Sequence, residues 1–305
     1  MSVKAVVAAS VTLLLWSSAF AGIRVGLAAG YTAGHVVLIR FLSASAVFVI
    51  YAAVRKIAVP RLRDIPLIAV LGFSGISVYH IALTFGERTV QAGTASLIIA
   101  SAPAFTALIA AFALSERLNR LGWLGIGLGF GGVAVIAFAS GHSPSFTYGA
   151  LLLVLAAVGT SFFFVYQKAL YTRYSPIDMS AYFTWFGTIP MLWFTPGLIH
   201  QVAHVPVSGT LTIIYIGVFP AAIAYGAWAI ALSVGRAGVV TSALYLEPVL
   251  AIIVAWIWIG EVPHLISILG GALATAGVIV TNLWGHEKTV PTTTALYTQA
   301  PSQEG

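Results

Sequence analysis

Residues 91–116 read QAGTASLIIASAPAFTALIAAFALSE, and residues 236–261 read RAGVVTSALYLEPVLAIIVAWIWIGE. A shift of 145 residues superposes the two stretches, pairing Pro103 with Pro248 and the glutamate that ends each stretch with its counterpart. Alanine and glycine matches are common in an apolar sequence, whereas proline and glutamate matches at one shared offset are not. The same offset aligns residues 72–135 without a gap, so the chain contains an internal repeat.

The composition of the 305-residue chain excludes a soluble globular domain. Hydrophobic residues make up 60% of it and charged residues 7%, with a mean hydropathy of +1.00, whereas soluble domains carry about 25% charged residues. The absence of cysteine excludes disulfide frameworks, thiolate metal sites and cysteine nucleophiles. Most of the chain must therefore be solvated by lipid, where a spanning helix needs roughly 20 apolar residues.

Ten long apolar runs predict ten membrane-spanning helices, because they are too long and too continuously apolar for the strands of a membrane barrel. The predicted spans are residues 5–28, 34–54, 65–86, 91–114, 121–140, 146–168, 177–196, 209–234, 238–260 and 264–284. Each half of the repeat holds five spans, an odd number, so the second half enters the membrane from the opposite side. We expect an all-α membrane protein with two inverted five-helix repeats, residues 1–142 and 143–284, and a disordered cytoplasmic tail at 285–305.

The positions of lysine and arginine predict the orientation in the membrane. With the N-terminus inside, cytoplasmic segments hold Lys4, Arg55, Lys56, Arg61, Arg63, Arg117, Arg120, Lys168, Arg173, Arg236 and Lys288, whereas outside loops hold only Arg24 and Arg88. This asymmetry predicts a multi-pass protein of the inner (plasma) membrane with both termini cytoplasmic. The basic residues are scattered over loop ends, so no nucleic-acid partner is expected.

Two prolines and two charged residues inside predicted spans are candidates for gating or structural roles. Pro103 and Pro248 each free a carbonyl four residues earlier, which could form pseudo-symmetric bends along a pathway or static kinks satisfied by hydroxyls. Glu247 has Ala102 as its repeat equivalent, which excludes a symmetric acid pair. It could be a proton-linked site, a partner for a substrate ammonium group, or a structural acid. Arg40 is predicted to extend to the interface or find a partner. Support of a cavity wall is favoured for it over contact with the substrate.

Polar aromatic residues predict the substrate site. His80 lies in the middle of the third span beside Tyr79, and its repeat equivalent is Tyr225, with Trp228 one turn further on. We expect His80 and Trp228 to face one central cavity, although a lone membrane histidine also fits plain hydrogen-bonded packing. The full predicted substrate-binding set is Trp16, Tyr79, His80, Ser101, Phe163, Tyr166, Tyr225, Trp228, Ser242 and Tyr245. Each could serve in helix packing, but together they suit a ligand with an apolar body and a polar head.

Over residues 5–284 the chain resembles the EamA-type drug/metabolite transporter superfamily. The motifs that carry this resemblance are Trp16-Ser17-Ser18-Ala19-Phe20, Arg40-Phe41, Ala102-Pro103 through Ser115-Glu116, and Leu246-Glu247-Pro248 through Gly260-Glu261. The resemblance implies a ten-helix, five-plus-five exporter of small metabolites. The aromatic interior is similar to that of exporters of aromatic amino acids.

We therefore expect a secondary transporter that exports small amphipathic metabolites, above all aromatic amino acids, by alternating access around a midplane cavity. One alternative is a proton-coupled exporter of cationic drugs, for which only Glu247 offers an acid. Another is a nucleotide-sugar or triose-phosphate carrier, which needs a buried basic cluster that Arg40 alone does not supply. The sequence has no H-E-x-x-H, G-x-S-x-G or Walker motif, which disfavours an enzyme. We expect no cofactor, no metal and no obligate protein partner; the expected partners are the substrate and the lipid bilayer.

Overall fold

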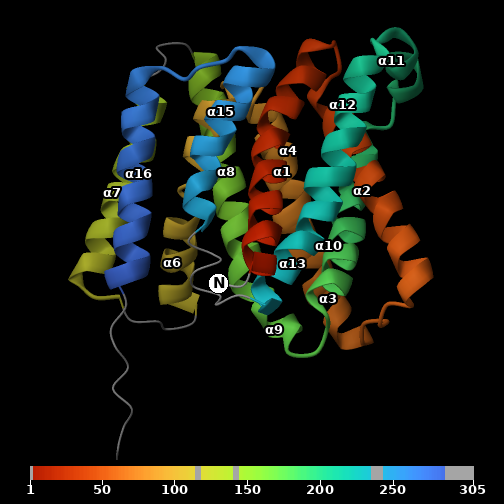
Figure 1. The fold of residues 1–305 in the computed structure, drawn as a ribbon, viewed down its shortest axis with the longest axis horizontal. Coiled ribbons are helices and arrows are strands. Elements are labelled where there is room, and N and C mark those ends of the chain that lie inside the picture. Colours follow the sequence, from red (N-terminus) through yellow and green to blue (C-terminus); the bar gives the residue numbers. More distant parts are fainter. Residues whose placement is uncertain (1–2, 114–117, 140–143, 235–242, 286–305) are drawn as a thin grey trace, which may run out of the picture.

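The computed structural model describes residues 3–113, 118–139, 144–234 and 243–285. All regular structure within these ranges is helical, and the long helices run side by side in one bundle (Figure 1). Glu116, Ser242 and nearly all of the predicted tail lie outside the described residues.

The first half of the chain contributes seven α-helices to the bundle. They are α1 (Val3–Ala28), α2 (Ala33–Arg55), α3 (Ile65–Gly72), α4 (Tyr79–Gly86), α5 (Ala92–Ile99), α6 (Ala102–Ala113) and α7 (Arg120–Ala139). The described α-helices of the second half are α8 (Pro144–Tyr166), α9 (Lys168–Tyr171), α10 (Pro176–Met191), α11 (Leu198–His204), α12 (Val207–Val218), α13 (Ala224–Val234), α15 (Glu247–Ile259) and α16 (Leu265–Trp284).

The helices have the length and composition of membrane spans. In the described ranges, seven helices or consecutive helical runs are long and apolar enough to cross a membrane: Val3–Ala28, Ala33–Arg55, Leu62–Gly86, Ala92–Ala113, Tyr148–Tyr171, Val207–Trp228 and Leu265–Trp284. Shorter apolar helices cover Arg120–Ile136 and Ala243–Ile259. Many large hydrophobic side chains on their outer faces are exposed, as lipid contact requires. The chain is therefore an all-helical, multi-pass membrane protein.

Two of the predicted spans are interrupted by a π-helical turn that the sequence reasoning did not anticipate. The turn η2 (Phe73–Val78) separates α3 from α4, and the turn η4 (Phe219–Ile223) separates α12 from α13. Both fall at the same place in the repeat. Pro220 has no backbone N–H, which removes one regular i→i−4 bond from the second turn. A π turn inserts extra backbone and is often found at functional sites.

The two repeat-related prolines do not bend continuous helices, so that expectation is corrected. The helix that α5 begins stops at Ile99, and α6 starts again at Ala102 with Pro103 as its second residue. Pro248 is the second residue of α15, which comes after the short 3-10 turn η5 (Ala243–Leu246). Proline is tolerated in the first turn of a helix, because the N–H it lacks would have no intrahelical partner there. Each proline therefore starts a half-helix.

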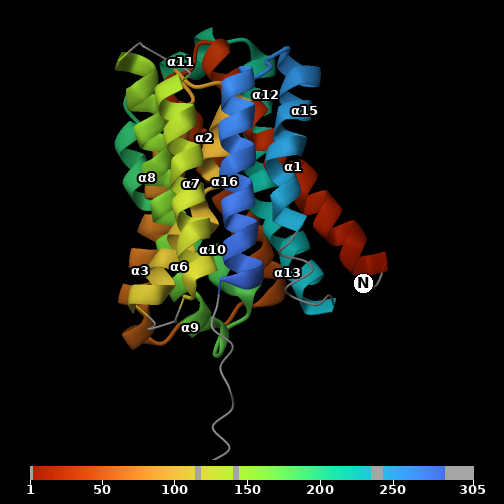
Figure 2. The same ribbon diagram turned by 90° about the vertical axis from the view of Figure 1, so that its left-hand side faces the viewer.

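The pair α7 and α16 packs backbone against backbone (Figure 2). A Cβ added to Gly125 would meet the Gly277 carbonyl oxygen, and one added to Gly277 would meet that of Gly125. Gly132 and Gly270 approach each other in the same reciprocal way. These pairings require the two helices to be antiparallel. In the repeat, Gly125 corresponds to Gly270 and Gly132 corresponds to Gly277, so the repeat relation converts one contacting pair into the other. This is the pattern of a self-complementary two-fold contact.

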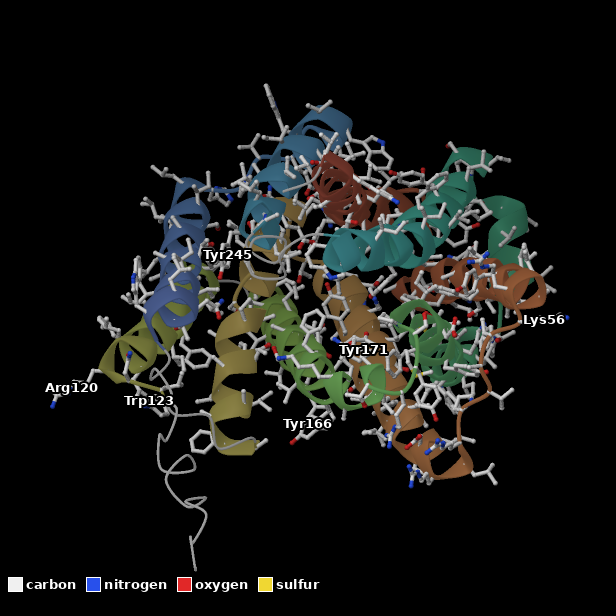
Figure 3. The ribbon with its side chains drawn as sticks, turned by 60° about the horizontal axis from the view of Figure 1, so that its bottom comes forward. Lys56, Arg120, Trp123, Tyr166, Tyr171 and Tyr245 are labelled. Carbon is white, nitrogen blue, oxygen red and sulfur yellow. The ribbon has the colours of Figure 1, made fainter. Side chains whose placement is uncertain are left out.

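The two ends of the bundle differ in charge. One end, here called the basic end, lies at the bottom of Figure 1, where α1 begins and α16 ends. It carries Arg55, Lys56, Arg61, Arg63, Arg120, Lys168 and Arg173, and Figure 3 shows it turned toward the viewer. At this end Asp64 pairs with Arg173 at 3.0 Å, which fastens the start of α3 to the segment after α9. The opposite end, here called the Glu261 end, holds the connections from α1 to α2, from α4 to α5 and from α15 to α16.

Candidate functional site

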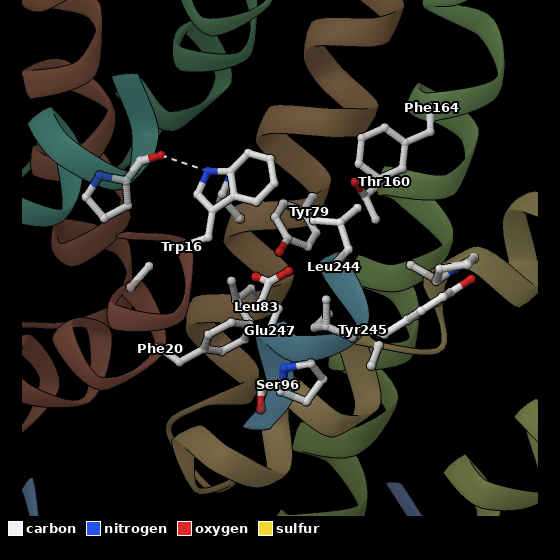
Figure 4. A pocket seen from close by; sticks show the side chains of 18 of the residues that line it. Trp16, Phe20, Tyr79, Leu83, Ser96, Thr160, Phe164, Leu244, Tyr245 and Glu247 are labelled. Carbon is white, nitrogen blue, oxygen red and sulfur yellow. Dashed lines mark hydrogen bonds between the residues drawn. The ribbon is translucent and has the colours of Figure 1, made fainter. Parts of the chain in front are cut away.

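A cavity of about 140 Å³ lies at the centre of the bundle. Nine of the residues singled out from the sequence line it: Trp16, Arg40, Tyr79, His80, Pro103, Tyr225, Tyr245, Glu247 and Pro248. They come from both halves of the chain, and Figure 4 shows several of their side chains around one space. A cavity of roughly 150 Å³ in another protein holds benzene, so this one has room for a single aromatic ring.

The π turns place the polar aromatics on the cavity wall. Tyr79 and His80 come directly after η2, and Tyr225 is the second residue after η4. The backbone carbonyl of Pro220, within η4, accepts a hydrogen bond of 3.1 Å from the indole Nε1 of Trp16 (Figure 4). The irregular turn thus supplies an acceptor that orients the Trp16 ring.

Trp16 connects the cavity to the second half of the chain. Its ring centroid lies 5.6 Å from that of Tyr225 in an edge contact and 5.5 Å from that of Trp228. Trp228 does not line the cavity, so the expectation that His80 and Trp228 face one space is corrected. One turn beyond Tyr225, Trp228 is displaced along α13 and packs beside Ala9 and Ala231.

The half-helices begin at the cavity. Ala102 and Glu247 are the first residues of α6 and α15, and both line it. Their backbone carbonyls are engaged by serines of neighbouring helices: Ser161 donates to Ala102 at 2.7 Å, and Ser17 donates to Glu247 at 3.1 Å. These bonds fix the start of each half-helix against α8 and α1.

Arg40 is the buried cation of the cavity, with 3% of its surface exposed. Its Nε and Nη1 atoms have no hydrogen-bond partner among the described residues, and its Cζ lies 5.5 Å from the centroid of the Phe41 ring. The expectation that Arg40 reaches the interface or finds a partner is therefore corrected. Helix α2 holds this residue too far from either end for its side chain to leave the interior.

His80 is equally enclosed. It is 4% exposed, and neither ring nitrogen has a hydrogen-bond partner in the described part of the chain. Its ring is held by Phe41 at 4.5 Å and Tyr79 at 4.4 Å between centroids. Packing fixes the ring, while its nitrogens stay free to bond a ligand.

Besides Trp228, three predicted substrate-binding residues lie outside the lining, and a fifth residue cannot be placed. Ser101 is buried and donates to the Ile98 carbonyl at 2.6 Å in the break between α5 and α6. Phe163 packs edge-on against Phe183 at 5.0 Å, in space left by the missing side chain of Gly75. Tyr166 packs in a tilted contact against its helix neighbour Phe162. Ser242 lies outside the described residues.

Several lining residues were not predicted, among them Phe20, Ser96, Thr160, Phe164 and Thr275. Phe20 was detectable in principle, since it stands four residues after the predicted Trp16 on the same helix face. Phe164 stands in the same relation to Thr160, which was itself not predicted. The others are small polar residues in apolar helices, which the sequence does not distinguish from packing residues.

A polar network fastens the Glu261 end of the bundle. Arg24 pairs with Glu261 at 2.7 Å and donates to the Glu87 carbonyl oxygen at 2.7 Å. The other carboxylate oxygen of Glu261 accepts from the Ala92 backbone N–H at 3.0 Å. The Glu87 side chain, just after the α4 span, is fully buried, and burial raises the pKa of its carboxyl well above the ordinary value. The network joins α1, α4 and α5 to the segment after α15.

Comparison with known proteins agrees with this architecture. The chain is 41% identical over 282 residues to the uncharacterized transporter YdfC of Bacillus subtilis, covering 92% of each chain. It is 40% identical over 279 residues to a probable terminal-alkyne amino-acid exporter of Streptantibioticus cattleyicolor, covering 92% of this chain and 93% of that one. A crystal structure with 20% identity superposes with a TM-score of 0.59, covering 92% and 96% of the two chains, which supports the fold.

The sequence profile of the EamA-like transporter family matches the chain twice, at residues 3–138 and 147–283. The two matches cover one half each and leave out little besides the central connection and the C-terminal tail. With two helical halves around one cavity, the chain belongs to the EamA-like transporter family and is a membrane transporter, not an enzyme.

Proposed function

We propose that this transporter is a secondary exporter of small amphipathic metabolites, with aromatic amino acids as its main substrates. The observation that carries the proposal is the central cavity, whose wall combines Trp16, Tyr79 and Tyr225 with the unpartnered polar groups of His80 and Arg40. Aromatic rings gain from stacking or edge contact with other rings. The buried polar groups gain from a ligand head group that bonds to them.

The substrate class is supported by size and by one relative. The cavity volume of about 140 Å³ fits one aromatic ring better than an extended drug or a nucleotide sugar. The relative from Streptantibioticus cattleyicolor, named a probable amino-acid exporter, aligns over nearly its whole length. Amino-acid export is therefore the function that we assign to this chain.

The mechanism we propose is alternating access between two inverted five-helix repeats, residues 1–142 and 143–284, with ten spans in all. Three observations support the inverted relation: the reciprocal glycine contacts of antiparallel α7 and α16, the matched π turns, and the matched half-helices that begin before Pro103 and Pro248. A two-fold axis that relates antiparallel helices lies in the membrane plane. Rocking of the halves around the cavity would open its two ends in turn.

We further propose that the protein resides in the inner membrane with the basic end and both termini in the cytoplasm. The excess of lysine and arginine at that end supports this orientation. The polar network of Arg24 and Glu261 then lies at the outer end.

Two rival functions are weaker. A cationic-drug/proton antiporter could use Glu247, the only acid that lines the cavity within the described residues, but Arg40 on the same wall repels a cation. A nucleotide-sugar or triose-phosphate carrier needs several cations for phosphate, and Arg40 is the only one lining this cavity in the described part of the chain.

The function is tested by counterflow of labelled tryptophan and phenylalanine in proteoliposomes, with and without a pH gradient. We expect saturable transport that Trp16→Ala and His80→Ala lower several-fold at normal protein levels. Trp228→Ala should lower it less, because Trp228 only supports Trp16. Trp123→Ala, on an exposed face of α7, is the matched control. Absence of aromatic amino-acid transport would refute the proposal, and strict gradient dependence abolished by Glu247→Gln would favour the antiporter.

A further inference from the structure

The cavity wall carries one basic and one acidic side chain. Among the described residues that line it, Arg40 and Glu247 are the only arginine, lysine, aspartate or glutamate. No ion pair joins them, because the salt bridges of the described chain connect Arg24 to Glu261 and Arg173 to Asp64. Each charge thus faces the cavity without the other as its partner.

Arg40 requires an anion. A guanidinium cannot lose its proton in a protein, so burial does not neutralise it, and two of its nitrogens lack acceptors among the described residues. The Phe41 ring contacts its carbon but accepts no conventional hydrogen bond. The planar fork of an arginine matches a carboxylate, which can accept two parallel bonds.

Glu247 requires a cation or donors. Its backbone carbonyl accepts from Ser17, while no hydrogen bond to its carboxylate is found within the described ranges. In Figure 4 the carboxylate extends from the start of α15 into the space between Trp16, Tyr79 and Leu83. A carboxylate is an acceptor only, so an ammonium group, with three donors, is its natural complement.

We infer that the cavity binds its substrate as a zwitterion, with Arg40 holding the carboxylate and Glu247 holding the ammonium group. The inference rests on the proposed function and specifies which atoms of the amino acid bind where. An amine without a carboxylate leaves Arg40 unpaired, and an acid without an amine leaves Glu247 unpaired. A phosphate or dicarboxylate adds negative charge beside Glu247. Only a neutral zwitterion satisfies both residues while its aromatic side chain lies against Trp16 and Tyr225.

The first experiment measures equilibrium binding of labelled phenylalanine to the purified protein, with competition by phenethylamine and by 3-phenylpropionate. Each competitor lacks one charged group of phenylalanine. Losing a hydrogen-bonded charge from a buried site weakens binding roughly 10- to 100-fold. Both competitors should therefore bind that much more weakly than phenylalanine. Equal affinity of phenylalanine and either competitor would overturn the assignment of the charge that the competitor lacks.

The second experiment pairs each charge with the analogue that does not use it. Arg40→Gln should weaken phenylalanine and 3-phenylpropionate by the same factor, and it should not weaken phenethylamine, from which it removes a repelling charge. Glu247→Gln should weaken phenylalanine and phenethylamine and spare 3-phenylpropionate. Arg88→Gln, which removes an exposed arginine, is the matched control and should bind all three ligands like the parent.

The outcomes separate this inference from the proposed function. If either variant weakens all three ligands alike, its residue is structural and the zwitterion assignment is wrong, although phenylalanine transport by the parent keeps the proposed function intact. If the parent binds and transports no aromatic amino acid, the proposed function itself fails. Should Arg40→Gln not fold, Arg40→Lys retains the charge without the planar fork and should still prefer phenylalanine to phenethylamine; loss of that preference would overturn the role of the charge.

Discussion

Replacing Gly132 with alanine should force α7 and α16 apart. The added Cβ would lie 2.5 Å from the backbone nitrogen of Ala274 and closer still to the Gly270 carbonyl oxygen. Both neighbours are backbone atoms of α16, so no side-chain rotation relieves the clash. The adjacent Gly131 is the matched control, because its added Cβ meets nothing within 4 Å.

The structure sets the size of the effect. Ordinary contact begins at 3.4 Å, so the distance to Ala274 must grow by about 0.9 Å. A gap of about 0.5–1 Å forfeits a quarter to a half of the dispersion attraction between the surfaces. Overpacking of this kind costs about 1–3 kcal/mol. The gain in helix propensity from Gly to Ala, about 0.5–1 kcal/mol, is common to both variants and cancels between them.

The assay is thermal unfolding of the purified variants in one detergent, monitored by the loss of the monodisperse peak. Gly132→Ala should melt several degrees below Gly131→Ala, which itself should melt at or above the parent. Equal melting of the two variants would refute the close approach of α7 and α16, and with it the reciprocal contacts that support the inverted repeat.

Three further predictions concern the ends of the bundle. Asp64→Ala, which strips the partly exposed Arg173 of its partner, should lower stability by about 1–3 kcal/mol in chemical unfolding, and Asp64→Asn should cost less. Because burial raises the pKa of Glu87, its ionisation opposes folding; stability should fall as pH rises from the ordinary value of 4.5 through the raised one. In Glu87→Gln, the melting temperature should fall less as pH rises. A fall as steep as that of the parent would mean that other groups cause the loss of stability. The chain lacks cysteine, so Arg63→Cys and His204→Cys should label from opposite sides of the membrane with an impermeant maleimide; labelling from one side would exclude the topology.

Much of the candidate site could be predicted because the two halves of the chain can be aligned with each other. The offset that pairs Pro103 with Pro248 also pairs His80 with Tyr225, and all four line the cavity. The half-helix starts, in contrast, were predicted as bends. A proline within an apolar run fits either a kink or a restart. The choice depends on whether neighbouring hydroxyls bond the carbonyls exposed at the end of the preceding helix, as Ser101 does for Ile98.

The sequence by itself determined that lipid surrounds the chain, where its apolar helices run, that it repeats, and which end is basic. These properties result from composition and order along the chain. Only the tertiary structure decided that Trp228 packs against Trp16 and that Phe163 fills the space beside Gly75. It also decided that two nitrogens of Arg40 have no hydrogen-bond partner among the described residues. In lipid, the outer and the packed faces of a helix are both apolar, so periodicity does not fix its rotation. A π turn adds a residue and rotates the rest of the helix by about 100°, and only packing shows where such a turn occurs.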